Sequence, residues 1–174
     1  MTHIQSFPPI AGPAADRLIL GSMPGKASLQ AQQYYAHPRN SFWRIMEAVL
    51  GVPASLPYAE RCLALAASGV AVWDVLQACT RSSSLDSDIV ESSIVANDLA
   101  TFLTRYPGIR TLYFNGRKAE AIFRRHLLPR LAGHPAELDT VALPSTSPAN
   151  ASLPVAEKIA RWRVIADPRT SSGS

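Results

Sequence analysis

Short apolar runs alternate along the chain with longer stretches in which apolar residues recur every three or four positions. Four of the short runs predict β-strands, and they cover residues 17–20, 70–73, 111–114 and 140–143. Strands that are apolar along their whole length are typical of a parallel sheet buried on both faces. The alternation of strands and helices therefore predicts an α/β fold of three layers, α/β/α, around a central four-stranded parallel sheet.

Five of the longer stretches have helical patterns. The clearest covers residues 41–50, where apolar side chains share one helical face until Gly51 ends the pattern. Less regular patterns cover residues 58–68, 94–106, 117–131 and 155–166. The chain has no internal repeat or linker that would divide it. We expect a single domain over residues 1–174 with its core at about 17–166, and mobile ends in the proline-rich opening and in residues 169–174.

Composition narrows the classes of protein to consider. A chain of 174 residues with 47% apolar residues can close one hydrophobic core. Its formal net charge of +4 suits a polyanionic partner, although many basic proteins bind no nucleic acid. Cys62 and Cys79 show neither CxxC nor paired-histidine spacing, which favours reduced thiols and a cytoplasmic protein. No apolar run approaches the roughly 18 residues of a membrane helix, and no signal peptide pattern is present, so we expect no membrane partner.

The segments that leave the carboxyl ends of the four predicted strands are rich in Gly, Pro, Asn and Ser. They are GSMPGK (21–26), DVLQACTRSSSLDSDI (74–89), NGR (115–117) and PSTSPAN (144–150). In an open parallel sheet, ligands bind in the crevice outside these strand ends. One such loop can be rich in these residues merely because it turns, but four together predict a common site.

The segment GSMPGK invites comparison with a phosphate-binding loop. Gly21 and Gly25 would let the backbone approach an anion, and Lys26 would neutralise it. The nucleotide-binding pattern GxxxxGK[ST] has a longer spacing between its glycines and no proline, and no GxGxxG occurs in the chain. By itself this loop is a weak signal.

The segment QQYYAHPRNSFW (32–43) places two aromatics, a histidine, an arginine and an asparagine directly before a predicted helix. Asn40 has an obvious structural interpretation, because Asn is a favoured helix N-cap. Tyr34 and Tyr35 are equally compatible with the hydrophobic core, and His37 with a structural hydrogen bond. From the residues alone, a structural role and a functional role both remain open for this segment.

Charged residues in the converging loops also have two interpretations. Asp86 and Asp88 could form a carboxylate site, but the turn-forming role of Asp side chains is the preferred interpretation. The basic residues in or beside these loops could contact phosphates or simply be solvated: Lys26, Arg39, Arg81, Arg117 and Lys118.

Together these blocks resemble a known family. GSMPG, YYAHPRNSFW, SLDSDI, FNG and LPSTSPAN occur in the order of the signature blocks of the uracil-DNA glycosylase superfamily. Their sequences are most similar to its hypoxanthine-DNA glycosylase branch, also called DNA-deoxyinosine glycosylases, and the resemblance covers residues 17–165. It implies a monofunctional hydrolase of base excision repair that flips hypoxanthine out of damaged DNA and cleaves its bond to deoxyribose.

The resemblance also implies roles for individual residues. Relatives that act on mismatched uracil and thymine carry GINPG in the first block, whose asparagine positions the attacking water, and Met23 stands at that position here. The catalytic residue implied for this chain is Asn40, which matches the asparagine of the PRN sequence in the hypoxanthine branch. Tyr35 matches the aromatic that stacks on the extruded base, and Asn115 matches the asparagine that reads the base edge.

The remaining site residues follow from the first and last blocks. The resemblance assigns Gly21, Ser22 and Met23 to the base pocket, and Pro24, Gly25, Lys26, Arg39, Ser145, Ser147, Pro148, Ala149 and Asn150 to DNA binding. The last block matches the loop that enters the minor groove, with the two serines on phosphates. Relatives often have a histidine or a bulky wedge in this loop, and this chain has neither, so the intercalating residue is left open.

Cofactors are not expected. Superfamily branches that hold an iron-sulfur cluster use four cysteines, whereas this chain has two. The resemblance therefore implies a monomer that acts on damaged DNA without a metal or cluster.

Three other functions compete with this interpretation. The same fold could prefer uracil or accept uracil, xanthine and hypoxanthine together. A second possibility is a non-catalytic DNA-binding module that kept the scaffold after losing the first-block asparagine. The third is a metal-dependent hydrolase of small nucleotides or phosphates built on residues 21–26.

Overall fold

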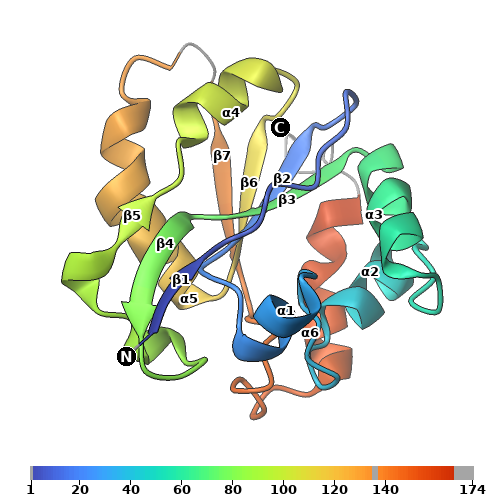
Figure 1. The fold of residues 1–174 in the computed structure, drawn as a ribbon. Coiled ribbons are helices and arrows are strands. Elements are labelled where there is room, and N and C mark those ends of the chain that lie inside the picture. The colour runs from blue at the N-terminus through green and yellow to red at the C-terminus, as the bar shows by residue number, and fades with distance from the viewer. Residues whose placement is uncertain (1, 135–136, 167–174) are drawn as a thin grey trace.

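The computed structural model describes residues 2–134 and 137–166 (Figure 1). Its strands are β1 (Thr2–Gln5), β2 (Arg17–Gly21), β3 (Val70–Asp74), β4 (Leu76–Arg81), β5 (Val95–Ala96), β6 (Thr111–Asn115) and β7 (Asp139–Leu143). Four of them form a parallel sheet in the order β3-β2-β6-β7. These are the four strands that the apolar runs predict, and the predicted central sheet is confirmed.

Helices cover both faces of this sheet (Figure 1). They are α1 (Lys26–Ala31), α2 (Phe42–Leu50), α3 (Tyr58–Ala67), α4 (Leu99–Arg105), α5 (Arg117–Ile122) and α6 (Val155–Trp162). Because side chains alternate along a strand, Leu18 and Leu20 of β2 pack with α4 and α5, whereas Ile19 packs with α2, α3 and α6. The three-layer α/β/α prediction is therefore confirmed.

Two of the predicted helices have different boundaries in the structure. The helix predicted over 94–106 starts only at Leu99, because Asp98 caps it by accepting hydrogen bonds from the Thr101 backbone N–H (3.1 Å) and hydroxyl (2.7 Å). The stretch predicted as one helix over 117–131 begins as α5. It continues as a π-helical turn (Phe123–Leu127) and a 3-10 turn (Leu128–Leu131), and the 3-10 turn contains a proline, which cannot donate a helical hydrogen bond.

A second, antiparallel sheet in the order β1-β4-β5 was not predicted. In it, Thr2 pairs with Arg81 and Gln5 with Ala78. Residues 2–5, which belong to the opening expected to be mobile, form a strand of this sheet. The strand β1 is short, polar and mostly exposed, so it carries no apolar run, and its partner lies far along the chain. The predicted mobile tail at 169–174 lies outside the described residues.

Short 3-10 turns connect or extend the main elements. They are Asp86–Asp88, Glu91–Ser93 and Arg163–Ala166. In the described parts of the chain, no helix has the length and apolar character needed to cross a membrane.

Candidate active site

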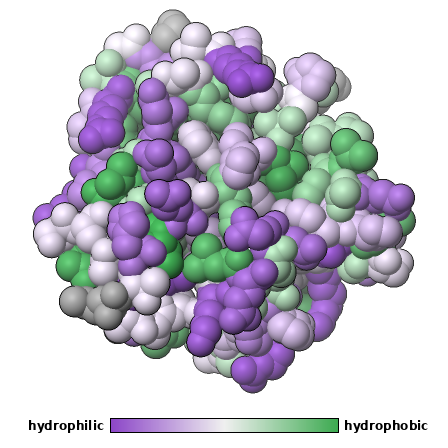
Figure 2. Space-filling view, in the orientation of Figure 1, coloured by the Kyte–Doolittle hydropathy of each residue, from purple (hydrophilic) through white to green (hydrophobic). Residues whose placement is uncertain are grey.

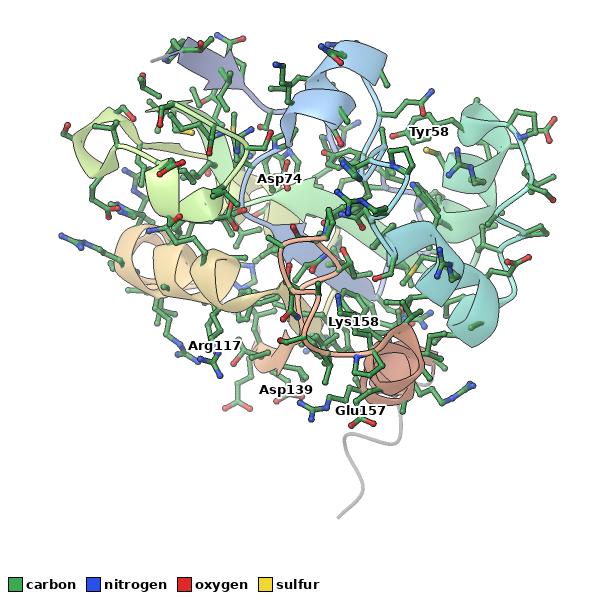
Figure 3. All side chains as sticks on the ribbon, turned by 90° about the horizontal axis from the view of Figure 1, so that it is seen from below. Tyr58, Asp74, Arg117, Asp139, Glu157 and Lys158 are labelled. Atoms are coloured by element: carbon green, nitrogen blue, oxygen red, sulfur yellow. The ribbon has the colours of Figure 1, made fainter. Side chains whose placement is uncertain are left out.

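A cavity of about 890 Å³ opens at the carboxyl ends of the parallel strands. Its lining comes from residues 21–28 and Gln30, from Tyr34, Tyr35, His37, Arg39 and Asn40, from Asp74 and residues 84–87, and from Asn115 and residues 145–150. Figure 3 looks onto this end of the molecule and shows Asp74 near the centre, between α1 and the segment that follows β7. Every residue that the sequence assigned to the site lines this one cavity.

Tyr35 lies in the left-handed region of the backbone, with φ of 57°, which is unusual for a bulky residue. Its ring stacks on the fully buried Phe42 at 4.1 Å between centroids, which fixes the ring in the cavity lining. Its hydroxyl is buried beside the Asn115 amide but makes no hydrogen bond of acceptable geometry. Burial is the main reason why the pKa of this phenol is raised, so Tyr35 stays neutral.

Tyr34 is a core residue, as its structural interpretation predicted. It is 4% exposed, its hydroxyl donates to the Pro8 carbonyl at 2.8 Å, and its own carbonyl accepts from the Trp43 indole at 2.9 Å. His37 is also engaged locally, since its Nδ1 accepts from the Arg39 backbone N–H at 3.0 Å.

Contrary to the suggestion from the sequence, Asn40 is not itself the N-cap of α2, because Ser41 occupies that position. Its side chain still supports the start of the helix, since Oδ1 accepts a hydrogen bond from the N–H of Phe42, the first residue of α2, at 3.0 Å. The same side chain lines the cavity, and a carbonyl oxygen has a second lone pair available. The bond to Phe42 therefore fixes the direction of the amide without using up its accepting capacity.

Thr146 is a site residue that the sequence analysis missed. It is 1% exposed, its N–H donates to Asn115 Oδ1 at 2.9 Å, and its Oγ1 accepts from Asn115 Nδ2 at 3.0 Å. Its carbonyl accepts from the backbone N–H of Ser41 at 3.1 Å. Thr146 thus ties the end of β6 to the start of α2, directly beside Asn40. Nothing in the PSTSPAN block shows which of its hydroxyls turns inward.

The rest of the 145–150 loop is shaped by its own side chains. Ser145 Oγ accepts from the Ser147 N–H at 3.1 Å, Ser147 Oγ accepts from the Ala149 N–H at 3.2 Å, and Asn150 Nδ2 donates to the Ser145 carbonyl at 3.1 Å. Both serine hydroxyls act as acceptors in these bonds. Their protons remain available to an anionic ligand such as phosphate.

Asp74, the last residue of β3, is the second site residue that was missed. It is 3% exposed and Oδ2 has no hydrogen-bond partner in the described residues. Burial, together with the nearby Asp86 carboxylate, raises the pKa of this carboxyl to about 7, and Arg81 acts in the opposite direction. Its position directly after a predicted strand, at the ligand-binding edge, was a signal that could have found it.

The charged residues of the loops at this end of the sheet differ in whether they reach the cavity. Asp88 accepts from the Ser83 hydroxyl, as the turn interpretation predicted, but Asp86 faces the cavity and accepts from the Ser22 hydroxyl at 2.7 Å. Arg81 is not available to phosphates, because pairing of β4 buries it and its guanidinium donates to the Pro24 carbonyl.

Of the other basic residues, Lys26 and Arg39 are exposed and line the cavity. Lys118 lies outside the lining and pairs with Glu91 at 3.8 Å, and Arg117 points away from the centre in Figure 3. Figure 2 shows hydrophilic side chains gathered at the lower part of the molecule, over α1 and the segments beneath it. Within residues 2–134 and 137–166, no three His, Cys, Asp or Glu side chains are grouped so that they could hold a metal ion.

Comparisons with known proteins point to one family. The family model for the uracil DNA glycosylase superfamily matches residues 8–166. A hypoxanthine DNA glycosylase of Methanosarcina acetivorans is 35% identical over 147 residues, which cover 84% of this chain and 87% of the relative. A protein of the same name from Methanosarcina barkeri is 35% identical over 66% of this chain and 72% of its own length.

Comparison with solved structures points to the same family. The solution NMR structure of a proposed uracil DNA glycosylase from Methanosarcina acetivorans matches with a TM-score of 0.75 and 32% identity, over 95% of this chain and all of that one. The resemblance first noted in the sequence blocks is thereby confirmed over the described core. This chain belongs to the uracil-DNA glycosylase superfamily.

Proposed function

We propose that this protein is a monofunctional DNA glycosylase that flips hypoxanthine out of DNA and hydrolyses its bond to deoxyribose. The observation that carries the proposal is that the Asn40 amide and the Tyr35 ring line one cavity at the ligand-binding edge of a glycosylase fold. The two relatives named hypoxanthine DNA glycosylase support the choice of base.

Recognition begins with eversion of the base, because an active site cannot reach a base inside a duplex. Unstacking costs a few kcal/mol, and stacking on an aromatic ring returns roughly 1–3 kcal/mol per base. Tyr35 is suited to this role because Phe42 supports one face of its ring at 4.1 Å. Asn115 can donate to and accept from the base edge, although its bonds to Thr146 leave it one donor and one lone pair for this purpose.

Bond cleavage places positive charge on the deoxyribose, so a fixed dipole beside the sugar lowers the barrier. Asn40 is neutral and does not remove a proton. Its carbonyl orients the attacking water and faces the cation-like sugar, and the water's proton passes to solvent. The hydrogen bond from Phe42 orients this carbonyl before substrate arrives.

The exposed edge of the cavity, here called the rim, binds the DNA backbone in this proposal. Lys26 and Arg39 are exposed there, and the hydroxyls of Ser145 and Ser147 can donate to phosphate oxygens. Pro148, Ala149 and Asn150 occupy the part of the loop proposed to fill the gap left by the flipped nucleotide. We further propose a cytoplasmic monomer that needs no metal ion or cluster.

The test is single-turnover release of hypoxanthine from a duplex with one deoxyinosine. Asn40→Ala should lower the rate at least about 100-fold while duplex binding persists. Asn40→Ser is the matched control, because serine caps a helix as well as asparagine but lacks the amide carbonyl. If Asn40→Ser restores the rate, the asparagine acts only as a cap and the proposed mechanism is wrong.

The same assay separates the competing functions. Duplexes that carry uracil or xanthine in place of hypoxanthine test the choice of base. Turnover beyond one equivalent excludes a non-catalytic binding module. Full activity in the presence of a chelator argues against a metal-dependent hydrolase, which should lose activity there.

A further inference from the structure

Two buried polar groups without partners meet beside Gly21. Asp74 Oδ2 and the Tyr35 hydroxyl make no hydrogen bond to the described residues. A Cβ at Gly21 would lie 2.6 Å from Asp74 Oδ1 and 2.8 Å from the Tyr35 hydroxyl, so both side chains reach the same point in the cavity lining. An unsatisfied buried polar group costs about 1–3 kcal/mol, so two together indicate a place where a ligand completes the hydrogen bonds.

The backbone holds the Asp74 carboxyl in this place. The Val75 N–H donates to the Gly21 carbonyl at 2.8 Å, which extends the parallel pairing of β2 and β3 past Asp74. From the other side, Asn97 Nδ2 donates to the carbonyls of Asp74 at 2.7 Å and Leu76 at 3.1 Å. Because both flanks of Asp74 are fixed, its side chain has little freedom to turn toward solvent.

Charged and titratable groups approach Asp74 from three elements. Asp86 comes from the 3-10 turn at 86–88 and Arg81 from β4, while Tyr34 and Tyr35 come from the segment after α1. Burial raises the pKa of the Asp86 carboxyl, and the hydrogen bond that the Ser22 hydroxyl donates to it opposes that rise. With burial and an anionic neighbour, the pKa of Asp74 rises to about 7, against the opposing effect of Arg81. The carboxyl therefore carries its proton much of the time at neutral pH.

We propose that Asp74 is the general acid that protonates N7 of the departing hypoxanthine, an inference that rests on the proposed function. The C1′–N9 bond breaks and its electron pair stays on the base, while the Asp74 proton goes to N7. Hypoxanthine then leaves as a neutral N7–H tautomer rather than as an anion. The attacking water forms the new bond to C1′ and gives its proton to solvent, and Asp74 recovers a proton from solvent.

Other groups in the cavity lining are less suited to this step. Asn40 is an amide and has no acidic proton to give. His37 is tied to the Arg39 backbone N–H through Nδ1, and Asp86 is tied to Ser22. Asp74 alone among these groups combines a carboxyl proton with burial and an oxygen that has no partner.

The experiment measures single-turnover release of hypoxanthine from a deoxyinosine duplex between about pH 5.5 and 9. We expect the wild-type rate to be constant below about pH 7 and to fall about tenfold per pH unit above it, because only protonated Asp74 acts. Asp74→Asn should lower the rate about 100-fold to 10,000-fold at pH 6 and make the remaining rate independent of pH. Duplex binding should change little, since an amide can still donate to N7.

Asp88→Asn is the matched control, because it makes the same change outside the cavity lining and should keep both rate and profile. A flat wild-type profile, or a profile that persists in Asp74→Asn, overturns the inference and leaves the proposed function standing. The wild-type profile decides even if the variant fails to fold. If wild-type protein releases no hypoxanthine at any pH, the proposed function itself fails, and this inference with it.

Discussion

The two sides of the cavity differ in how their polar groups are satisfied. On the amide side, Asn115 and Thr146 are hydrogen-bonded to each other, and Thr146 and Asn40 each accept a hydrogen bond from the start of α2. On the carboxyl side, Asp74 and Arg81 are buried and each keeps one polar atom without a partner.

A neutral amide can be oriented at little cost, whereas a buried acid that is ready to give a proton must be held in an unfavourable environment. The amide side therefore supports positioning, and the carboxyl side supports proton transfer at the expense of stability. This difference can be tested where the sides meet, and then on each side separately.

Gly21 lies where the two sides meet, and the largest effect is expected there. In Gly21→Ala the new Cβ would lie 2.6 Å from Asp74 Oδ1, and neither the short Asp74 side chain nor the ring of Tyr35, stacked on Phe42, can easily move away. We expect hypoxanthine release to fall about 100-fold or more while the protein stays folded. Single-turnover assays with circular dichroism check this.

Gly12→Ala is the control for that substitution. Its Cβ would lie 3.4 Å from the Ala66 Cβ, away from the cavity, so the rate should be unchanged. A wild-type rate in Gly21→Ala would mean that the space beside Gly21 is not used by the substrate.

The carboxyl side should lower stability in a pH-dependent way. The native pKa of Asp74 is about 7, above the value of the unfolded chain, so stability falls as pH rises from about 4 to 7 and then stays low. Asp74→Asn removes the cost of burying this carboxylate and should raise the free energy of unfolding by about 4 kcal/mol at pH 8, with little gain near pH 4.

Urea unfolding at both pH values measures the effect, with Asp88→Asn as the control. No gain at pH 8 would show that the Asp74 carboxylate is not buried at a cost. A gain in stability together with a loss of excision would be the trade-off expected of a functional strained site.

These residues also show how far the sequence could predict the molecule. Three of the four central strands, β2, β3 and β6, were found because burial makes them largely apolar, whereas β7 is mostly exposed and was found from its short apolar run alone. The strand β1 was missed because it is mostly exposed and its pairing with β4 is set by tertiary contacts.

The sequence blocks predicted that Asn40, Tyr35 and Asn115 share one site, and in the structure all three line the same cavity. Their roles in catalysis and base binding stay predictions. Thr146 has no local sequence signal, and Asp74 has only its position directly after a predicted strand. Their significance depends on burial and on partners more than ten positions away in the chain, such as Asp86 and Asn115, which only the fold brings together.

The amide side is tested by Thr146→Val, which keeps the shape of the side chain but removes Oγ1. The backbone bonds of Thr146 to Asn115 and Ser41 persist, while Asn115 Nδ2 loses its acceptor inside the protein. We expect about 1 kcal/mol lower stability and about tenfold slower excision, measured by urea unfolding and single-turnover assays. Thr104→Val removes an exposed hydroxyl bond on α4 and should leave the rate unchanged.

The smallest effect is expected at the rim, which belongs to neither side. Lys26 and Arg39 are proposed to neutralise phosphates, so replacing either by alanine should weaken DNA binding without changing the single-turnover rate at saturation. Each loss should also reduce the slope of log K against log salt by about 0.9 for duplex DNA. Arg105→Ala, at the far end of α4, should leave the slope unchanged. If the rim substitutions slowed the chemical step at saturating enzyme instead, phosphate contacts would be coupled to base eversion, and positioning could no longer be ascribed to the amide side alone.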